Sequence, residues 1–90
     1  MPRVIRYRVA IERRAEKFLA KLNDVRLKTR LLEAIDALAD SPRPHVAKKM
    51  AGTECRYRIR VGDYRIIYEI EADAILVLVV DIGHRREIYT

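Results

Sequence analysis

Apolar residues in the first half of the chain recur every three or four positions, which is the spacing of one face of a helix. The first stripe comprises Ile11, Ala15, Phe18, Leu19 and Leu22, and the second comprises Leu27, Leu31, Ala34, Ile35 and Leu38. Asn23-Asp24 interrupts the pattern and supplies a side chain that can cap the second helix. Proline at positions 42 and 44 ends that helix, because proline lacks a backbone N–H and restricts its predecessor. The pattern predicts a helical hairpin with a very short connection.

Strand patterns flank the helical hairpin in the sequence. Arg3–Val9 alternates imperfectly before it, and three strands are expected after it, at Cys55–Val61, Asp63–Glu71 and Ile75–Ile82. Gly62-Asp63 is a tight hairpin signal, whereas His45–Glu54 is typical of a loop. The predicted fold class is α+β, in the order β-α-α-β-β-β. The helical hairpin is expected to pack on one face of a small, largely antiparallel four-stranded sheet, with the apolar last strand at its centre.

Alternation predicts which way the strand side chains point, because successive residues of a strand face opposite sides of the sheet. The helices need an apolar surface, so they should cover the side carrying Tyr57, Ile59, Val61, Tyr64, Ile66 and Tyr68. Arg58, Arg60 and Arg65 then emerge together on the open face. Several guanidinium groups on one sheet face suit a polyanion.

Composition narrows the class of protein. Ninety residues make one domain, expected to span residues 1–90, and an apolar content of 50% excludes a disordered chain. The net charge of +6 favours phosphate-rich partners or an acidic protein. Residues 1–50 hold thirteen Lys/Arg against six Asp/Glu, and residues 51–90 hold six against seven. Residues 51–90 therefore have no net positive charge, and only the alternation along the strands predicts that their arginines share one face.

Other residues bear on compartment and cofactors. Ala74–Val80 is far shorter than the roughly 18 apolar residues that a membrane span needs, and no signal peptide is visible. A lone Cys55 cannot form an internal disulfide, so a cytoplasmic location is expected. His45 and His84 are isolated, without the spacing of metal ligands, so we expect no metal and no cofactor.

Two runs carry a family resemblance. The run Tyr57–Tyr68 (YRIRVGDYRIIY), the ending Gly83–Tyr89 (GHRREIY), the lysine-containing loop before Gly52 and the order of elements resemble the RelE/ParE toxins of toxin–antitoxin pairs. The resemblance covers nearly the whole chain. It implies one of two activities, since the RelE branch cuts messenger RNA in the ribosomal decoding site and the ParE branch poisons DNA gyrase.

The resemblance also assigns roles to residues. Basic positions of the RelE branch match Arg58, Arg60, Arg65 and Arg85, its C-terminal tyrosine matches Tyr89, and His84 occupies another position that is often basic. Arg58 and Arg60 stand where lysine is frequent, and the spacing from Arg85 to Tyr89 is shorter than in the best-described members. The implied protein is a ribosome-dependent mRNA endoribonuclease, inhibited by a cognate, short, acidic antitoxin, with the ribosome and mRNA as further partners.

RNA supplies its own nucleophile, the 2′-hydroxyl, so cleavage requires a base, stabilisation of the phosphorane-like charge and an acid for the 5′-oxygen. Arginine suits phosphate and stays ionised, which makes it a charge stabiliser and a poor proton carrier. Arg65 and Arg85 therefore join the catalytic set as charge stabilisers, with His84 and Tyr89 as proton carriers. Arg58, Arg60, Lys48 and Lys49 are expected to bind RNA phosphates.

Plainer interpretations stay open. Arg58 and Arg60 can pair across strands with Glu69 and Glu71, and Arg65 can form a structural ion pair. His84 can be a bystander and Tyr89 can cap the core. The basic residues of the helices are either solvated or contact RNA or an antitoxin. The rival functions are a ParE-like gyrase inhibitor without catalysis and a non-toxic member that only binds RNA or its partner.

Overall fold

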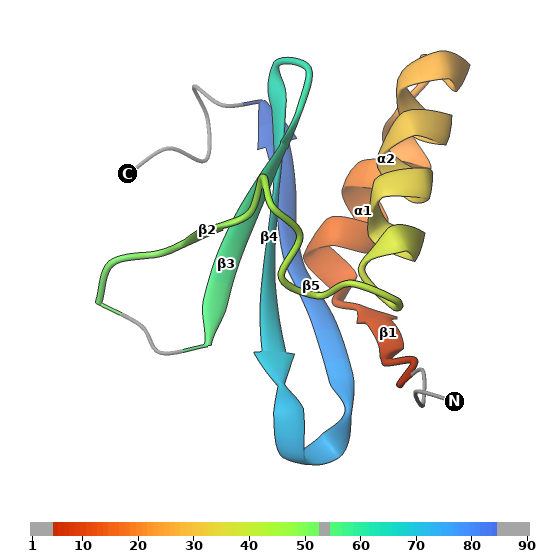
Figure 1. Ribbon diagram of the computed structural model, residues 1–90. Helices are drawn as coiled ribbons and strands as arrows, with labels where there is room; N and C mark the ends of the chain where they lie inside the picture. The colour runs from red at the N-terminus through yellow and green to blue at the C-terminus, as the bar shows by residue number, and fades with distance from the viewer. Residues whose placement is uncertain (1–4, 53–54, 85–90) are drawn as a thin grey trace.

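The computed structural model describes residues 5–52 and 55–84, which form two helices and a mixed sheet (Figure 1). In chain order the elements are β1 (Arg8–Ile11), α1 (Arg13–Lys21), α2 (Val25–Ala37), β2 (Lys48–Lys49), β3 (Arg56–Val61), β4 (Tyr64–Glu71), the 3₁₀ turn η1 (Ala72–Ala74) and β5 (Leu76–His84). The predicted α+β class and the helical hairpin on one face of the sheet are confirmed. The helices lie on one side of the sheet, and no other described element covers the opposite side.

The sheet has five strands rather than the four expected, in the order β1-β5-β4-β3-β2. The additional strand is β2, whose two lysines lie in the predicted loop and pair antiparallel with Arg58 and Tyr57 of β3. Two residues are too few to show alternation, which is why the sequence did not reveal this strand. All neighbouring strands are antiparallel except β1 and β5, which run parallel. The last strand, β5, is an interior strand between β1 and β4, as expected, although the middle strand of the sheet is β4.

The helical hairpin forms where the apolar stripes predicted it. Asp24 caps α2, since its carboxylate accepts a hydrogen bond from the backbone N–H of Leu27 at 3.1 Å. Leu22 and Asn23 complete the short connection between the helices. Ile11, expected on the first helix, belongs to β1 instead, because the backbone stays extended until Glu12.

The core lies between the helices and one face of the sheet. Its buried residues from the helices are Ala15, Leu19, Leu31, Ile35 and Leu38, and those from the strands are Ile59, Val61, Ile66, Tyr68, Ile70, Val77, Val79 and Ile82. Tyr57 and Tyr64 pack against this cluster from its edge. The predicted inward face of the hairpin β3–β4 is therefore confirmed, and burial of its apolar side chains drives the docking of the helices.

A β-bulge changes the alternation along β5. Ile67 pairs with Asp81 whereas Tyr68 pairs with Val79, so the ladder passes over Val80. Before the bulge Val79 faces the core, and after it Ile82 does, three residues later. The bulge thus sets which side chains at the end of β5 share the helix-covered face.

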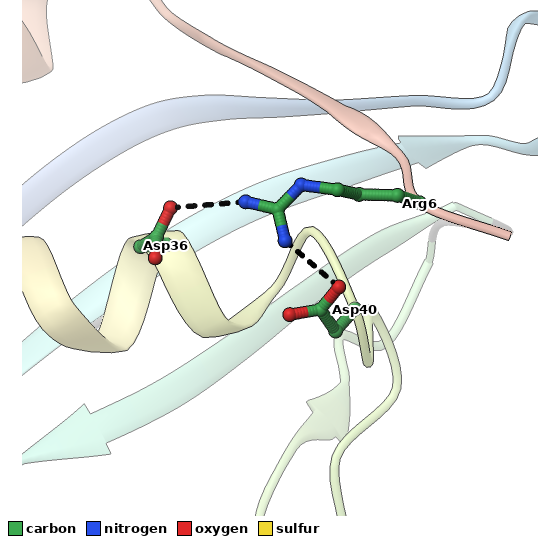
Figure 2. A network of polar contacts seen from close by, with 3 residues as sticks. All are labelled: Arg6, Asp36 and Asp40. Atoms are coloured by element: carbon green, nitrogen blue, oxygen red, sulfur yellow. Dashed lines mark hydrogen bonds and ion pairs between the residues drawn. The ribbon is translucent and has the colours of Figure 1, made fainter. Parts of the chain in front are cut away.

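The segment before β1 is tied to the end of α2. Arg6 donates to Asp40 at 2.9 Å and reaches Asp36 at 3.5 Å, as Figure 2 shows. The Tyr7 backbone N–H also donates to the Ala39 carbonyl at 2.7 Å. The ion pairs are exposed and contribute little to stability, so the backbone bond and the pairing of β1 with β5 hold this segment. Within the described chain no helix is long and apolar enough to cross a membrane.

Candidate polyanion-binding site

The strand register brings four of the predicted site residues together on the face away from the helices. Arg60 and Arg65 are direct cross-strand partners, and Arg58 pairs with Lys48 on its other side. Arg58 and Arg60 are two residues apart on β3 and so share one face. Partners across an antiparallel pair have Cα atoms only about 4.5–5.5 Å apart. Four cations therefore converge from three adjacent strands.

These four cations line one pocket of about 110 Å³, which we call the arginine pocket. Its lining residues are Val46, Lys48, Arg58, Ile59, Arg60 and Arg65. The predicted meeting of Arg58, Arg60 and Arg65 on one side of the sheet is thus a feature of the structure, and Lys48 joins them. A hollow of this size with cations around it fits a small anionic group such as a phosphate.

The arginines differ in how firmly they are held. Arg60 is exposed, and its Nε donates to the Gly62 carbonyl at 3.0 Å across the β3–β4 turn. Gly62 adopts a φ of +60°, a conformation that favours glycine, so the turn that anchors Arg60 depends on this residue. Arg58 and Arg65 are half-buried, and Nη1 of Arg65 is enclosed by protein. Partial burial restricts their rotamers, which pre-organises the site for an anion.

The plainer interpretation of Arg58 and Arg60 as partners of Glu69 and Glu71 does not match the register. Glu69 pairs with Arg56, whose Nη2 and Nε donate to one carboxylate oxygen at 2.6 and 3.0 Å. Glu71 lies opposite Leu76 on β5, on the other side of β4 from β3. Neither carboxylate is therefore the direct cross-strand partner of Arg58 or Arg60.

Direct pairing of Arg60 with Arg65 is by itself unfavourable, because like charges opposite each other destabilise a sheet. An anion between them reverses the sign of this interaction. The arrangement can therefore bind a phosphodiester and stabilise the additional negative charge of a pentacoordinate transition state. Its arginines stay ionised, so they stabilise charge rather than transfer protons.

Two other predicted residues lie elsewhere. Lys49 pairs with Tyr57, and alternation places it on the side opposite Lys48. The ring of His84 meets that of Tyr64 edge-on, with centroids 5.4 Å apart, and Tyr64 packs on Phe18 of α1 at 5.9 Å. His84 therefore belongs to the helix-covered side, whereas its neighbour Gly83 is the residue opposite Arg65. Arg85 and Tyr89 lie outside the described residues.

Sequence reasoning missed the hydrophobic part of the site. Val46 lines the arginine pocket, although it lies in the predicted loop His45–Glu54, of which only Lys48 and Lys49 were assigned to the site. Arg56 shares the face of Arg58 but is committed to Glu69. The spacing Arg56, Arg58, Arg60 was visible in the sequence, and the alternation signal extends to all three.

The loop that leads from α2 to β2 is fixed to the sheet by stacked side chains. Tyr68 donates from its hydroxyl to the Pro42 carbonyl at 2.8 Å, and its ring stacks on Tyr57 with centroids 6.0 Å apart. Arg43 in turn lies over the Tyr57 ring and donates to its hydroxyl at 3.2 Å. Burial, reinforced by the Tyr57 hydroxyl, raises the pKa of Tyr68 to about 12, so it remains a donor at neutral pH. This loop carries Val46 and Lys48 to the arginine pocket.

Comparison with known proteins gives two kinds of match. Residues 9–89 match the family model described as the ParE toxin of the type II toxin–antitoxin system parDE. The structure resembles that of the archaeal RelE–RelB complex from Pyrococcus horikoshii OT3, with a TM-score of 0.77, 31% identity, and coverage of 90% of this chain and 97% of that one. No curated protein sequence matches the chain.

Two further solved structures are similar. The intact E. coli RelBE toxin–antitoxin complex gives a TM-score of 0.75 at 25% identity, covering 87% of this chain and 95% of that one. The RelB–RelE antitoxin–toxin complex from Methanococcus jannaschii gives 0.71 at 26% identity, covering 89% and 94%. All three are complexes of RelE with RelB, and those from E. coli and M. jannaschii are described as complexes of a toxin with its antitoxin.

Proposed function

Because this chain belongs to the RelE/ParE family of type II toxins, we propose that it is a ribosome-dependent endoribonuclease that cleaves messenger RNA. It acts in the cytoplasm, where translating ribosomes present the message. The cognate antitoxin holds it inactive. The proposal takes the RelE side of the family, to which the similar complexes from P. horikoshii, E. coli and M. jannaschii belong by name.

The observation that carries the proposal is the convergence of Lys48, Arg58, Arg60 and Arg65 around one pocket on the face that the helices leave open. Within the described strands, Glu69 is bonded to Arg56, whereas Arg60 and Arg65 are direct cross-strand neighbours of like charge. A phosphate-binding role explains why four cations are gathered from three strands against their mutual repulsion.

In the proposed reaction the 2′-oxygen of the message attacks the adjacent phosphorus, and the 5′-oxygen of the next nucleotide leaves. Lys48, Arg58 and Arg60 hold the phosphates in line, which lowers the entropic cost of the attack. Arg65, half-buried beside Arg60, stabilises the charge that develops on the non-bridging oxygens. Arg85 is proposed to help stabilise this negative charge, and Tyr89 is proposed to transfer a proton.

The role of His84 is narrower than the family pattern implies. Its ring is packed against Tyr64 on the side away from the arginine pocket. Proton transfer by His84 would require a different position of the end of β5 when RNA and the ribosome are bound. We therefore assign the proton-transfer steps to Tyr89 and to ribosomal or RNA groups before His84.

A second candidate function has one observation in its favour. The matching family model is described as ParE, and a ParE-like protein would inhibit DNA gyrase without a catalytic site. Under this alternative the arginine pocket would bind an acidic surface of a protein rather than a phosphodiester.

Primer extension on cellular messages after induction tests the proposal. Wild-type protein should produce cuts that are phased with codons and confined to translated regions, whereas a gyrase inhibitor would induce a DNA-damage response with intact messages. Arg65→Ala and Arg85→Ala should each abolish growth arrest, and Tyr89→Phe should reduce it. Arg13→Ala is the matched control, because Arg13 is an exposed cation on α1, on the other side of the sheet.

Folding of each variant is checked by circular dichroism and thermal denaturation. Full toxicity in a folded Arg65→Ala/Arg85→Ala double variant would show that the arginine pocket is not the active site. Intact messages after induction of a toxic wild-type protein would refute RNA cleavage itself.

A further inference from the structure

A second hollow lies beside the arginine pocket, between the C-terminal half of α2 and β3. It has a volume of about 190 Å³ and is lined by Ala34, Ala37, Leu38, Ser41, Pro44, Val46, Ile59, Arg60 and Val61. We call it the aliphatic pocket. It is smaller than the pockets of about 300–1,000 Å³ that bind small molecules, so its size suits a single side chain.

The aliphatic pocket and the arginine pocket share three lining residues, Val46, Ile59 and Arg60. Ile59 faces the helices and Arg60 faces the other side of β3, so a ligand that contacts both pockets passes around the edge of this strand. Val46 has 68% of its surface exposed, so an apolar side chain of a ligand can reach it at the junction of the two pockets. The two pockets together offer an apolar anchor point next to a group of positive charges.

Positive charge also surrounds this region on the helix side. The guanidinium of Arg30 on α2 reaches to 3.6 Å from the position that a Cβ on Gly62 would take. His45, Lys48, Arg60 and Gly62 line a third, more open hollow that adjoins the other two. Arg60 thus lines the aliphatic pocket itself, and Lys48 and Arg30 lie at the neighbouring hollow and the β3–β4 turn.

We propose that the aliphatic pocket receives an apolar side chain of the antitoxin, and that acidic residues flanking this side chain cover the arginine pocket. The proposal rests on the proposed function for the identity of the partner. The occupant is an acidic protein segment, because its carboxylates complement Lys48, Arg58, Arg60 and Arg65 and its apolar side chain complements the aliphatic lining. Binding at the aliphatic pocket would then exclude RNA from the neighbouring phosphate site.

RNA fits the aliphatic pocket less well. Proteins hold unpaired bases on aromatic rings or guanidinium planes and satisfy their polar edges. Among the described residues that line this pocket none is aromatic, and the polar side chains are those of Ser41 and Arg60. A buried base would leave its ring nitrogens and carbonyls without partners. The chemistry of the lining therefore favours an aliphatic side chain.

The test fills the aliphatic pocket without altering a charge. Ala37 is exposed at the end of α2 and lines the pocket, so Ala37→Phe places a large ring over its mouth. Ala20→Phe is the matched control, since Ala20 is an exposed alanine on α1 that lines neither pocket. Ser41→Leu repeats the test at another exposed lining position.

The probe is the full-length product of the reading frame adjoining this gene, titrated calorimetrically into each toxin variant. Ala37→Phe and Ser41→Leu should raise its Kd about ten- to a hundredfold, the value of burying one large aliphatic side chain. Ala20→Phe should leave the Kd unchanged. Cleavage of messages on translating ribosomes should be the same for all three variants and the wild type.

An unchanged Kd for Ala37→Phe and Ser41→Leu would overturn the proposal, as would an equal loss of affinity in Ala20→Phe or no binding of the probe to wild-type toxin. Loss of RNA cleavage with retained affinity for the probe would assign the aliphatic pocket to RNA and also overturn it. The proposed function fails separately. If the wild-type protein leaves messages intact while Ala37→Phe still weakens binding of the probe, the docking proposal stands and the nuclease proposal fails.

Discussion

Neutralising one cation of the arginine pocket should reduce the salt dependence of RNA binding by a definite amount. Each phosphate contact releases condensed counterions, so the logarithm of the binding constant falls with the logarithm of salt concentration in proportion to the number of contacts. Lys48, Arg58, Arg60 and Arg65 line one pocket, which predicts up to four such contacts with a single-stranded message.

The magnitude follows from the slope per contact, which is about −0.7 for single-stranded nucleic acid. Four contacts give a slope of about −2.8, so raising the salt from about 50 to about 200 mM weakens binding about fiftyfold. Arg58→Gln leaves three contacts and a slope of about −2.1, which corresponds to a loss of only about eighteenfold. Arg60→Gln should give the same change in slope.

The assay is fluorescence anisotropy with a short RNA that carries 2′-O-methyl groups, so that it binds without being cut. Binding constants are measured over a series of salt concentrations for the wild type, Arg58→Gln, Arg60→Gln and the double variant. Arg13→Gln is the control, because it removes the same charge from α1 on the helix-covered side.

A slope that falls by the same amount in Arg13→Gln as in Arg58→Gln would refute the reasoning, because RNA would then respond to net charge rather than to this face. A wild-type slope in the Arg58→Gln/Arg60→Gln double variant would also refute it. Both outcomes would leave the sheet topology intact and remove the phosphate-binding role of the arginine pocket.

Two further predictions concern stability. Tyr68 has a pKa raised to about 12 by burial, against about 10 in the unfolded chain. The unfolded state therefore ionises first, and stability that is complete below pH 10 is lost as the pH rises toward 12. Urea titrations should show a loss of about 1.4 kcal/mol between pH 9 and pH 11 that is absent from Tyr68→Phe, with Tyr64→Phe as the control. Asp24→Ala removes the cap of α2 and should cost about 1 kcal/mol by thermal denaturation, and an unchanged melting temperature would contradict this assignment.

Much of the fold was readable because burial imposes a period on the sequence. The stripe Leu27–Leu38 predicted α2. Asp24 marked the start of this helix, because its side chain accepts a hydrogen bond from the backbone of Leu27, only three positions later. Gly62 marked the β3–β4 turn, where the backbone takes a positive φ. These signals are local, so a linear sequence contains them in full.

Other parts of the fold depend on distant partners. β2 is a strand only because β3 offers it an edge, and no property of Lys48-Lys49 requires that. The parallel pairing of β1 with β5 joins residues almost seventy positions apart. Contacts of this range are decided by the packing of whole elements rather than by local preference.

The sequence alone determined that Arg58, Arg60 and Arg65 share a side of the sheet, because alternation along a strand allows no other arrangement once the apolar side is buried. Tertiary structure decided the rest of the site. The pairing of β2 with the edge of β3 placed Lys48, rather than Lys49, on the side of the arginines. The register of β5 with β4, which contains a bulge, placed His84 beside Tyr64. The loop from α2 brought Val46 to the pocket. Each of these outcomes depends on the register between separate segments. The free energy that selects a register comes from contacts between segments in the assembled sheet, so no single segment specifies it.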